Sequence, residues 1–336
     1  MRQRERNVLI AGAIFGFAAG AVFRGVFDPA ETRTALNFLR SALNGSILAV
    51  SMVFADQWLG HRAEDWLRRR SLAVELLVSG AVLALAATVA QVFAQAVLFR
   101  EPWSMIVHLL VPQIGFALSM AMLFLAVDHT ARLVGAGQFM RVLVGHYRRP
   151  VEEHRVFLFA DLVGATRLAE TLGPVRVQAL IARFFHDVDE TIVDHGGEVH
   201  AYIGDEVIVT WPLATGVADA ACVRCVFAMR DRIAALAGSY EAEFGTVPAF
   251  RAALHCGPVV LSEIGRSKGQ IGIFGDTVNV AARLEQHAKD LDRGLLVSGD
   301  LLDRLNLPPG IAVEDLGDLA LRGRDARLRA FAAERP

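Results

Sequence analysis

Two carboxylates in the second half of the chain each stand beside an apolar, strand-like run. Asp161 ends the run Arg155-Val-Phe-Leu-Phe-Ala-Asp161, and Gly204-Asp205 separates residues 198–203 from residues 206–211. Short apolar runs bounded by turn residues predict buried strands, and two such runs around a tight turn predict a hairpin. Two carboxylates at adjacent strand ends can hold two Mg²⁺ ions about 3.5–4 Å apart. Considered alone, Asp205 would be an ordinary turn residue.

A turn suited to an anion follows Asp161 directly. Residues 164–166 precede a predicted helix, and free N–H groups at such a helix start attract phosphate. Farther along, Asn279 and Arg283 are four residues apart in a helical pattern and share one face. An Asn beside an Arg can orient a ribose and neutralise a phosphoryl transition state. The simpler alternative is a surface ion pair of Arg283 with Glu285 or another neighbour.

The elements that would position these residues alternate between strands and helices. Apolar residues recur at helical spacing from 174 to 195, and a Gly-Gly pair ends that pattern. A short strand turns at Gly275 into the helix that carries Asn279 and Arg283. The other predicted elements are a long helix over 217–244 and strands near 250–255 and 259–263.

The first half of the chain differs in composition from the second, because residues 1–130 are unusually apolar. Four apolar runs predict four transmembrane helices, at 8–27, 41–59, 72–99 and 103–127. The first run could instead be a signal peptide, but more apolar runs follow it and a clear small-x-small cleavage pattern does not. Arginines cluster before the first run, between the second and third, and after the fourth, so the positive-inside rule puts both termini in the cytoplasm. Residues 131–150 are predicted to be a linker and residues 151–336 a soluble domain.

Small residues in the apolar runs favour an anchor or a dimerising sensor over a transporter. Gly12, Gly16 and Gly20 are four residues apart, a spacing typical of helix packing. The net charge of -2 provides no basic field for nucleic-acid binding. The three cysteines have neither disulfide nor zinc-site spacing, so we expect them to be small buried residues.

Four motifs make the soluble half resemble the class III adenylate/guanylate cyclases, specifically the membrane-anchored bacterial type, over residues 145–333. They are Phe159-Ala-Asp161-Leu-Val-Gly164-Ala-Thr166, Gly204-Asp205, Asn279-x-x-x-Arg283 and Leu321-Arg322-Gly323-Arg324. The resemblance implies an α+β catalytic domain with a βαββαβ ferredoxin-like core behind an all-α transmembrane domain. It also implies a head-to-tail homodimer with two composite sites. The expected location is the bacterial cell (inner) membrane, with several spans and a cytoplasmic catalytic domain.

The resemblance also assigns roles to the motif residues. The ligands implied for two divalent ions per site, Mg²⁺ or Mn²⁺, are Asp161, Asp205 and the backbone carbonyl of Leu162. The groups implied for phosphate binding are the backbone amides of Gly164, Ala165 and Thr166 and the side chain of Arg322 or Arg324. The residues implied to come from the other subunit are Asn279, which would orient the ribose, and Arg283, which would stabilise the transition state.

The implied reaction is the cyclisation of ATP to 3′,5′-cyclic AMP and pyrophosphate, with GTP as the runner-up substrate. At the two positions where the family recognises the purine, this chain has Ala201 and Gly272, whose side chains cannot hydrogen-bond a base. Base selection would then depend on the backbone, on water or on neighbours, namely His200, Tyr202, Lys268 and Gln270. This departure raises the alternative of a nucleotide-binding sensor that does not turn substrate over.

A diguanylate cyclase, which has a related core, is a further alternative. Gly196-Gly197-Glu198 matches part of its hairpin signature, but Val199-His200 follows where an acidic–aromatic pair is expected. The predicted partners are ATP or GTP, a second copy of the chain and membrane lipid, and no nucleic acid is expected.

Overall fold

The structure is a computed structural model, and it describes residues 3–27, 34–68, 70–134, 145–265, 270–320 and 327–335. The chain divides into two compact units, residues 1–134 and 135–336. The division falls inside the predicted linker 131–150, of which residues 135–144 lie outside the described part.

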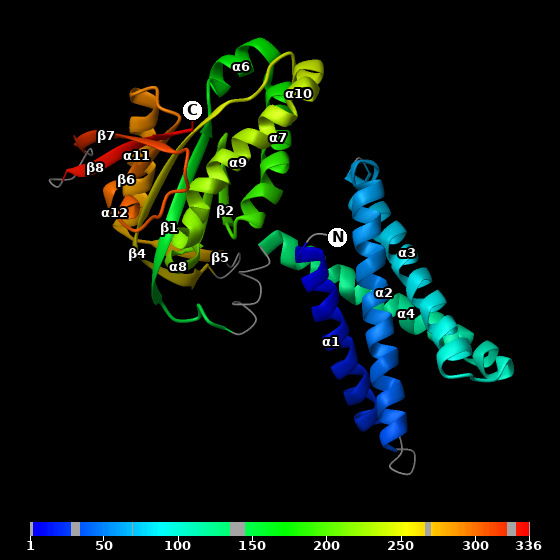
Figure 1. Ribbon diagram of the computed structural model, residues 1–336. Coiled ribbons are helices and arrows are strands. Elements are labelled where there is room, and N and C mark those ends of the chain that lie inside the picture. Colours follow the sequence, from blue (N-terminus) through cyan, green and yellow to red (C-terminus); the bar gives the residue numbers. More distant parts are fainter. Residues whose placement is uncertain are drawn as a thin grey trace. The chain divides into compact units, whose positions relative to one another are not determined.

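The described part of the first unit is helical (Figure 1). Its elements are α1 (Gln3–Phe27), α2 (Ala35–Arg68), α3 (Leu72–Phe93), the short π-helix η2 (Ala94–Leu98) and α4 (Trp103–Val134). Among the described residues, three stretches are long and apolar enough to cross a membrane: Ala35–Gly60, Leu72–Leu98 and Leu110–Thr130. The apolar part of α1, Val8–Val22, is shorter, so the first of the four predicted spans stays a prediction.

Glycines allow α1 and α2 to pack with their backbones in contact. A Cβ on Gly16 would collide with the backbone of Gly45, and a Cβ on Gly20 with that of Ser41. The Ser41 hydroxyl donates a hydrogen bond across this contact to the Gly20 carbonyl, at 2.8 Å. The glycine spacing in the first apolar run is therefore confirmed as a packing face for Gly16 and Gly20.

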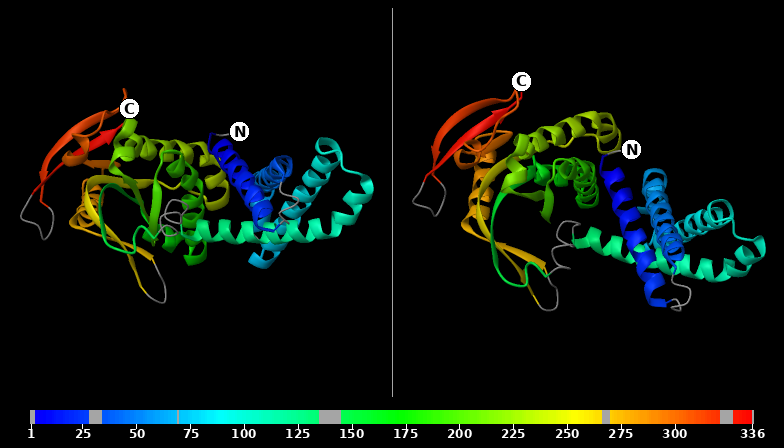
Figure 2. Two further views of the ribbon diagram at one scale, coloured as in Figure 1. Left: turned by 90° about the horizontal axis from the view of Figure 1, so that it is seen from below. Right: turned by 60° about the horizontal axis from the view of Figure 1, so that its bottom comes forward.

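The second unit is built on one eight-stranded sheet in the order β2-β3-β1-β4-β6-β8-β7, with β5 paired to β4. Neighbouring strands are antiparallel, except that β4 and β6 are parallel. The β7–β8 hairpin forms one end of the sheet, as Figure 2 shows in orange and red. The strands are β1 (Val151–Leu162), β2 (Glu198–Ile203), β3 (Glu206–Pro212), β4 (Phe250–Ile264), β5 (Gln270–Phe274), β6 (Leu295–Ser298), β7 (Ala312–Leu319) and β8 (Leu328–Glu334).

The strand predicted to end at Asp161 and the hairpin around Gly204-Asp205 are confirmed. The two strands predicted near 250–255 and 259–263 are one strand, β4. Gly257 and Pro258 between them stay in register with β1, so the pairing continues through them.

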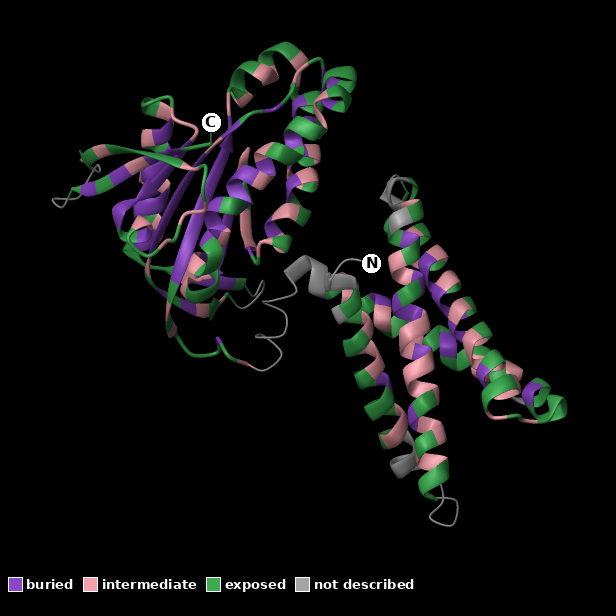
Figure 3. Ribbon diagram, in the orientation of Figure 1, coloured by how far each residue is buried: buried purple, intermediate pink, exposed green. Residues whose placement is uncertain are grey.

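Helices cover both faces of the sheet (Figures 1 and 3). They are α6 (Ala165–Leu172), α7 (Pro174–Asp194), α8 (Leu213–Val217), the 3₁₀ turn η3 (Ala218–Ala220), α9 (Ala221–Ala235), α10 (Ala237–Phe244), α11 (Asp276–Asp290) and α12 (Gly299–Leu302). Along β1 the side chains alternate: Leu158 joins the core under α7 and α9, and Phe159 joins the core under α11. Asp161 follows the parity of Phe159 and therefore faces α11.

The single long helix predicted over 217–244 is wrong. Asp219 and Ala220 have positive φ angles, and Leu236 leaves the helical conformation between α9 and α10. The change of direction at Leu236 lets Tyr240 and Phe244 pack into the same core as α9. Apolar spacing alone did not show this break, because both helices bury residues in one cluster.

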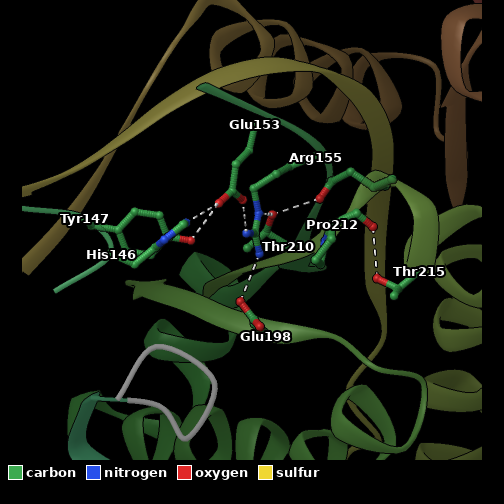
Figure 4. Close-up of polar contacts among 9 residues, drawn as sticks. His146, Tyr147, Glu153, Arg155, Glu198, Thr210, Pro212 and Thr215 are labelled. Atoms are coloured by element: carbon green, nitrogen blue, oxygen red, sulfur yellow. Dashed lines mark hydrogen bonds and ion pairs between the residues drawn. The ribbon is translucent and has the colours of Figure 1, made fainter. Parts of the chain in front are cut away.

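Just before β1, the side chain of Tyr147 is held in place by packing and by a hydrogen bond. Tyr147 is 2% exposed and packs in the core under α11. Its hydroxyl donates to Glu153 at 2.9 Å, and Glu153 also accepts from the buried Arg155 at 2.9 Å (Figure 4). Arg155 donates in addition to Glu198 of β2, at 2.9 Å, and to Thr210 of β3, at 3.0 Å. This network, Tyr147-Glu153-Arg155-Glu198 with Thr210, joins the first half of β1 to the start of β2 and the end of β3.

Candidate active site

Asp161 is the penultimate residue of β1 and is 7% exposed. Across the antiparallel ladders it lies opposite Glu206 of β3 on one side and Arg251 of β4 on the other. Directly opposed residues point to the same face of a sheet, so Glu206 and Asp161 are neighbours on the α11 side. The alternation of β1 thus brings the carboxylate to a covered edge of the sheet.

Asp205 reaches Asp161 from the tip of the β2–β3 hairpin. Gly204 has a φ of 66°, the left-handed conformation that a two-residue hairpin turn requires. The backbone N–H of Leu162 donates to the Asp205 carbonyl at 3.4 Å, which ties the turn to the end of β1. Burial and the nearby Asp161 carboxylate both raise the pKa of Asp205. The structure therefore brings the two carboxylates together.

A helix adds further charged groups that the sequence patterns did not reveal. The Nζ of Lys289 lies 2.9 Å from Oδ2 of Asp161 and 3.4 Å from Oε1 of Glu285. Glu285 is 3% exposed, and its Oε1 has this ion pair but no well-aligned hydrogen bond to a described residue. Glu285 and Lys289 are four residues apart on α11, and that spacing was the signal available in the sequence.

Negative charge is in excess around Lys289. Burial, Glu285 and Asp161 raise the pKa of Glu206 to about 7. Burial raises the pKa of Glu285 as well, and Lys289 opposes that shift. Four carboxyl groups thus surround one ammonium, and such a site attracts further cations.

The donor set suits a hard divalent cation. Asp161, Asp205 and the carbonyl of Leu162 offer oxygen atoms only, the ligands that Mg²⁺ and Mn²⁺ prefer. Within the described residues, no cluster of three or more His, Cys, Asp or Glu side chains forms a closed metal site. Mg²⁺ usually takes one or two carboxylates and completes its shell with water and substrate phosphates.

The turn after Asp161 presents backbone donors. Gly164 has a φ of 74°, and α6 begins at Ala165. The N–H groups of Ala165 and Thr166 therefore lie in the first turn of a helix, where no intrahelical acceptor is available. A phosphate beside the two carboxylates would meet these donors and the positive end of the helix dipole.

Asn279 and Arg283 point elsewhere. Asn279 is exposed, Arg283 is half-buried, and neither makes a hydrogen bond or an ion pair with the part of the chain that is described. Asn279 lies six residues before Glu285, and Arg283 lies six residues before Lys289. This spacing corresponds to a rotation of about 120° around the helix. Glu285 is buried against Lys289, so the alternative surface pair of Arg283 with Glu285 does not form. One helix thus offers the Asp161-facing pair and, on another side, an unpartnered Asn–Arg pair.

The two positions expected to recognise the purine, Ala201 and Gly272, carry a methyl group and no side chain, respectively. Ala201 lies in β2, beside a register shift at His200. Gly272 is in β5, where a Cβ would lie 2.8 Å from Cε2 of Phe274 and 2.9 Å from Cδ1 of Ile264, so a side chain there requires these two neighbours to move. Of the neighbours, Tyr202 is 48% exposed and donates to Asp189 at 3.5 Å, and Gln270 is exposed. Lys268, Arg322 and Arg324 lie outside the described residues.

Fold and site together define an α+β domain in which two carboxylates meet beside an anion-binding turn. Residues 150–332 match the family described as "Adenylate and Guanylate cyclase catalytic domain". The match covers more than half of the chain, and the chain belongs to this family.

Proteins similar to this chain carry the same domain. The chain is 45% identical over 196 residues to "Adenylate cyclase 2" of Rhizobium meliloti (strain 1021). This alignment covers 58% of the chain and 54% of that protein. The chain is 30% identical over 195 residues to "Adenylate cyclase 1" of the same organism, covering 56% of this chain and 29% of that protein. The fold matches a bacterial light-regulated adenylyl cyclase with a TM-score of 0.52 at 21% identity, over 64% of each chain.

Proposed function

We propose that this chain is a membrane-anchored adenylate cyclase that converts ATP to 3′,5′-cyclic AMP and pyrophosphate. The observation that carries the proposal is the meeting of Asp161 and Asp205 at the end of β1, next to the Gly164–Thr166 turn. The name of the relative at 45% identity supports ATP as the substrate.

The residues would act on the two ends of the substrate. The amides of Ala165 and Thr166 would bind phosphate oxygens, and Asn279 would hold the ribose so that its 3′-oxygen faces the α-phosphorus. The 3′-oxygen bonds to that phosphorus, the bond from phosphorus to the α–β bridging oxygen breaks, and pyrophosphate leaves with the electron pair. The 3′-hydroxyl proton is released, and Arg283 would neutralise the charge on the phosphoryl group. Two Mg²⁺ or Mn²⁺ ions held by Asp161, Asp205 and the Leu162 carbonyl would supply charge neutralisation of the triphosphate.

The side of α11 on which Asn279 lies supports a shared site. Because Asn279 and Arg283 are turned about 120° from the pair that contacts Asp161, we infer that they serve the site of a second copy of the chain. A two-fold, head-to-tail homodimer would then contain two composite sites. Asp161→Ala and Arg283→Ala should each lose at least about a hundredfold in rate. Mixing the two variants should restore up to a quarter of the wild-type activity.

A turnover assay with both nucleotides tests the reaction itself. Purified full-length chain in lipid nanodiscs, with Mg²⁺ or Mn²⁺, should form cyclic AMP from ATP, with the product identified by mass spectrometry. Binding of nucleotide without any product would instead indicate a non-catalytic sensor. A cyclic dinucleotide product from GTP would replace the proposal with a diguanylate cyclase.

Guanylate cyclase activity is the second candidate, because neither Ala201 nor Gly272 presents a side chain that could distinguish the two purines. The ratio of kcat/KM for ATP and GTP decides between the two candidates.

The charge pattern supports an orientation in the membrane. Arginines are frequent in residues 62–70, which include the last two turns of α2, so we propose that this end of α2, the N-terminus and the cyclase domain lie in the cytoplasm. The α3–α4 connection would then lie on the outer side. Cysteine labelling with an impermeant reagent in intact cells tests this arrangement.

A further inference from the structure

A stripe of exposed side chains runs along the end of α2 and just past it. Its members are spaced four residues apart: Phe54, Trp58, Arg62, Trp66 and Arg70. Phe54 is 60% exposed, Trp58 49% and Trp66 48%, and both arginines are exposed. Four residues of an α-helix make one turn and about 40° more, so the members within α2 lie on one slowly winding face.

The two arginines of the stripe lie over its two tryptophans. The guanidinium carbon of Arg62 is 5.9 Å from the ring centre of Trp58, and that of Arg70 is 5.2 Å from the ring centre of Trp66. Both distances are within the range of a cation–π contact. The side chain of Arg62 follows the general lean of helical side chains toward the helix N-terminus, and Arg70, beyond the end of α2, reaches back in the same direction. Each positive charge is therefore directed toward the apolar part of α2.

The stripe crosses the depth at which the apolar stretch of α2 ends. The part apolar enough to cross a membrane is Ala35–Gly60, so Trp58 lies in its last turn. Trp66 lies six residues, or about 9 Å, past Gly60 along the helix. The headgroup layer of a bilayer is about 5–8 Å thick on each side, and tryptophan is enriched at this depth. Phe54 therefore faces acyl chains, and the tryptophans and arginines face the headgroup layer.

The charge of this segment favours an anionic partner. Residues 58–70 contain four arginines but only two acidic residues, Glu64 and Asp65, and neither of these falls on the four-residue spacing of the stripe. A guanidinium that lies over a ring still presents its N–H edge, which fits the oxygens of a phosphate. Aromatic rings at the depth of the upper acyl chains, with guanidinium groups directly beyond them, match the two parts of a phospholipid.

We propose that this stripe binds an anionic phospholipid of the surrounding membrane. Arg62 donates to the headgroup phosphate, Arg70 adds positive charge at its outer edge, and the upper acyl chain packs on Phe54 and Trp58. In the proposed orientation this lipid belongs to the cytoplasmic leaflet.

The opposite end of α2 offers an internal comparison. There the guanidinium carbon of Arg40 lies 5.8 Å from the ring centre of Phe99, but Arg40 also pairs with Glu101 at 3.4 Å. The carboxylate neutralises that contact, so we expect it to show no preference for an anionic lipid.

The test measures quenching of tryptophan fluorescence by brominated lipid, with the full-length chain in nanodiscs. Bromine on the acyl chains quenches nearby rings, so brominated phosphatidylglycerol and brominated phosphatidylcholine at the same mole fraction differ only in the headgroup. The reporter is Trp103→Phe, which leaves Trp58, Trp66 and Trp211, and Trp211 is fully buried in the second unit and gives a constant background. At low salt, quenching by the anionic lipid should exceed quenching by phosphatidylcholine at least about twofold.

Variants of the charged members separate headgroup binding from simple anchoring. Adding Arg62→Gln and Arg70→Gln should remove the excess quenching by the anionic lipid. Quenching by phosphatidylcholine should stay the same, because the stripe keeps its depth. Arg40→Gln is the matched control and should leave the excess intact.

A second reporter examines the other end of the first unit. Trp58→Phe with Trp66→Phe leaves Trp103, which is 68% exposed at the start of α4 and should be quenched equally by both lipids. Equal quenching of the stripe by both lipids, or no quenching by either, overturns the proposal. Loss of the excess in inorganic phosphate at constant ionic strength also overturns it, because the arginines would then bind a free anion. The readout does not involve nucleotide turnover, so it stands or fails separately from the cyclase activity.

Discussion

At the scale of single residues, several carboxyl groups lie close together at the carboxyl end of β1, and the ammonium group of Lys289 holds them there. Asp161, Glu206 and Glu285 converge on the Lys289 ammonium, and Asp205 closes the group from the hairpin turn. Lys289 occupies an oxygen of Asp161 that a divalent cation would also need. It therefore acts on metal binding in two opposite ways: it orders Asp161, and it repels the incoming ion.

The sizes of the two effects show that repulsion of the metal ion by Lys289 outweighs its ordering of Asp161. A unit charge and a divalent ion about 5 Å apart repel by about 7 kcal/mol at an effective dielectric constant of about 20, before screening by salt. Ordering one side chain contributes only about 0.5–1.5 kcal/mol. Lys289→Met should therefore tighten Mn²⁺ binding to the full-length chain about tenfold or more, measured by electron paramagnetic resonance titration. Lys289→Arg keeps the charge and serves as the control, and weaker binding in Lys289→Met would contradict the argument.

His200 gives the β2–β3 hairpin a predictable pH dependence. Burial, and secondly the charge of Arg155, lower the pKa of His200 below its ordinary value of about 6.5. In the unfolded chain this histidine binds a proton at a higher pH than in the folded chain. Stability is therefore fully present above pH about 6.5 and falls as the pH is lowered through that value. The protection factors of the hairpin amides, which correct for the slower intrinsic exchange at low pH, should fall on acidification, and His200→Asn should reduce that fall. An unchanged pH profile in the variant would show that other groups are responsible.

At the scale of elements, two features position the site: the register of the β2-β3-β1 ladders and the rotation of α11. The first sets Glu206 against Asp161, and the second separates the Glu285–Lys289 pair from the Asn279–Arg283 pair. Both follow from the regular geometry of strands and helices. A substitution that shifts the ladder register or rotates α11 should therefore affect the site even when it lies far from it.

The buried Arg155 holds the first half of β1, the start of β2 and the end of β3 together, and its loss should loosen all three. Arg155→Met removes three hydrogen-bonded contacts, but Glu153 and Glu198 are each about one-fifth exposed and can regain water. We expect a loss of about 2–3 kcal/mol, near the lower end of values for breaking buried pairs. Faster hydrogen exchange of the β1 amides in the full-length chain measures it. Glu198→Gln, which keeps an acceptor, should cost less, and an equal cost would contradict this account.

The α1–α2 contact depends on glycine. Gly16→Leu should separate the two helices because its side chain would overlap the Gly45 backbone. Gly115→Leu is the matched control, since a Cβ there meets nothing within 4 Å. A disulfide between cysteines placed across the contact should form readily in the control and poorly in Gly16→Leu. Equal formation would exclude close helix packing.

At the scale of the whole molecule, the sequence predicted the two-part organisation and the main elements of the second unit. Short-range patterns were sufficient for β1, the hairpin and the start of α11, because each is bounded by glycine or a polar cap. They were insufficient for Lys289 and Glu285, whose importance depends on a strand more than a hundred residues earlier. The parallel pairing of β4 with β6 likewise joins residues that are far apart in the sequence, and local patterns do not predict it. Gly272 shows the same limit, since only the structure reveals that the side chains of Phe274 and Ile264 crowd the place of its missing Cβ.

The Tyr147 anchor has a consequence for how any signal could reach Asp161. Tyr147 lies four residues before β1, and Asp161 lies near the far end of this 12-residue strand, which pairs with β3 on one edge and β4 on the other. Sliding such a strand by one residue would turn every side chain to the wrong face, so longitudinal displacement is forbidden. A force on the segment before Tyr147 can therefore reach Asp161 only by tilting or twisting β1 as a whole, over a length of about 40 Å.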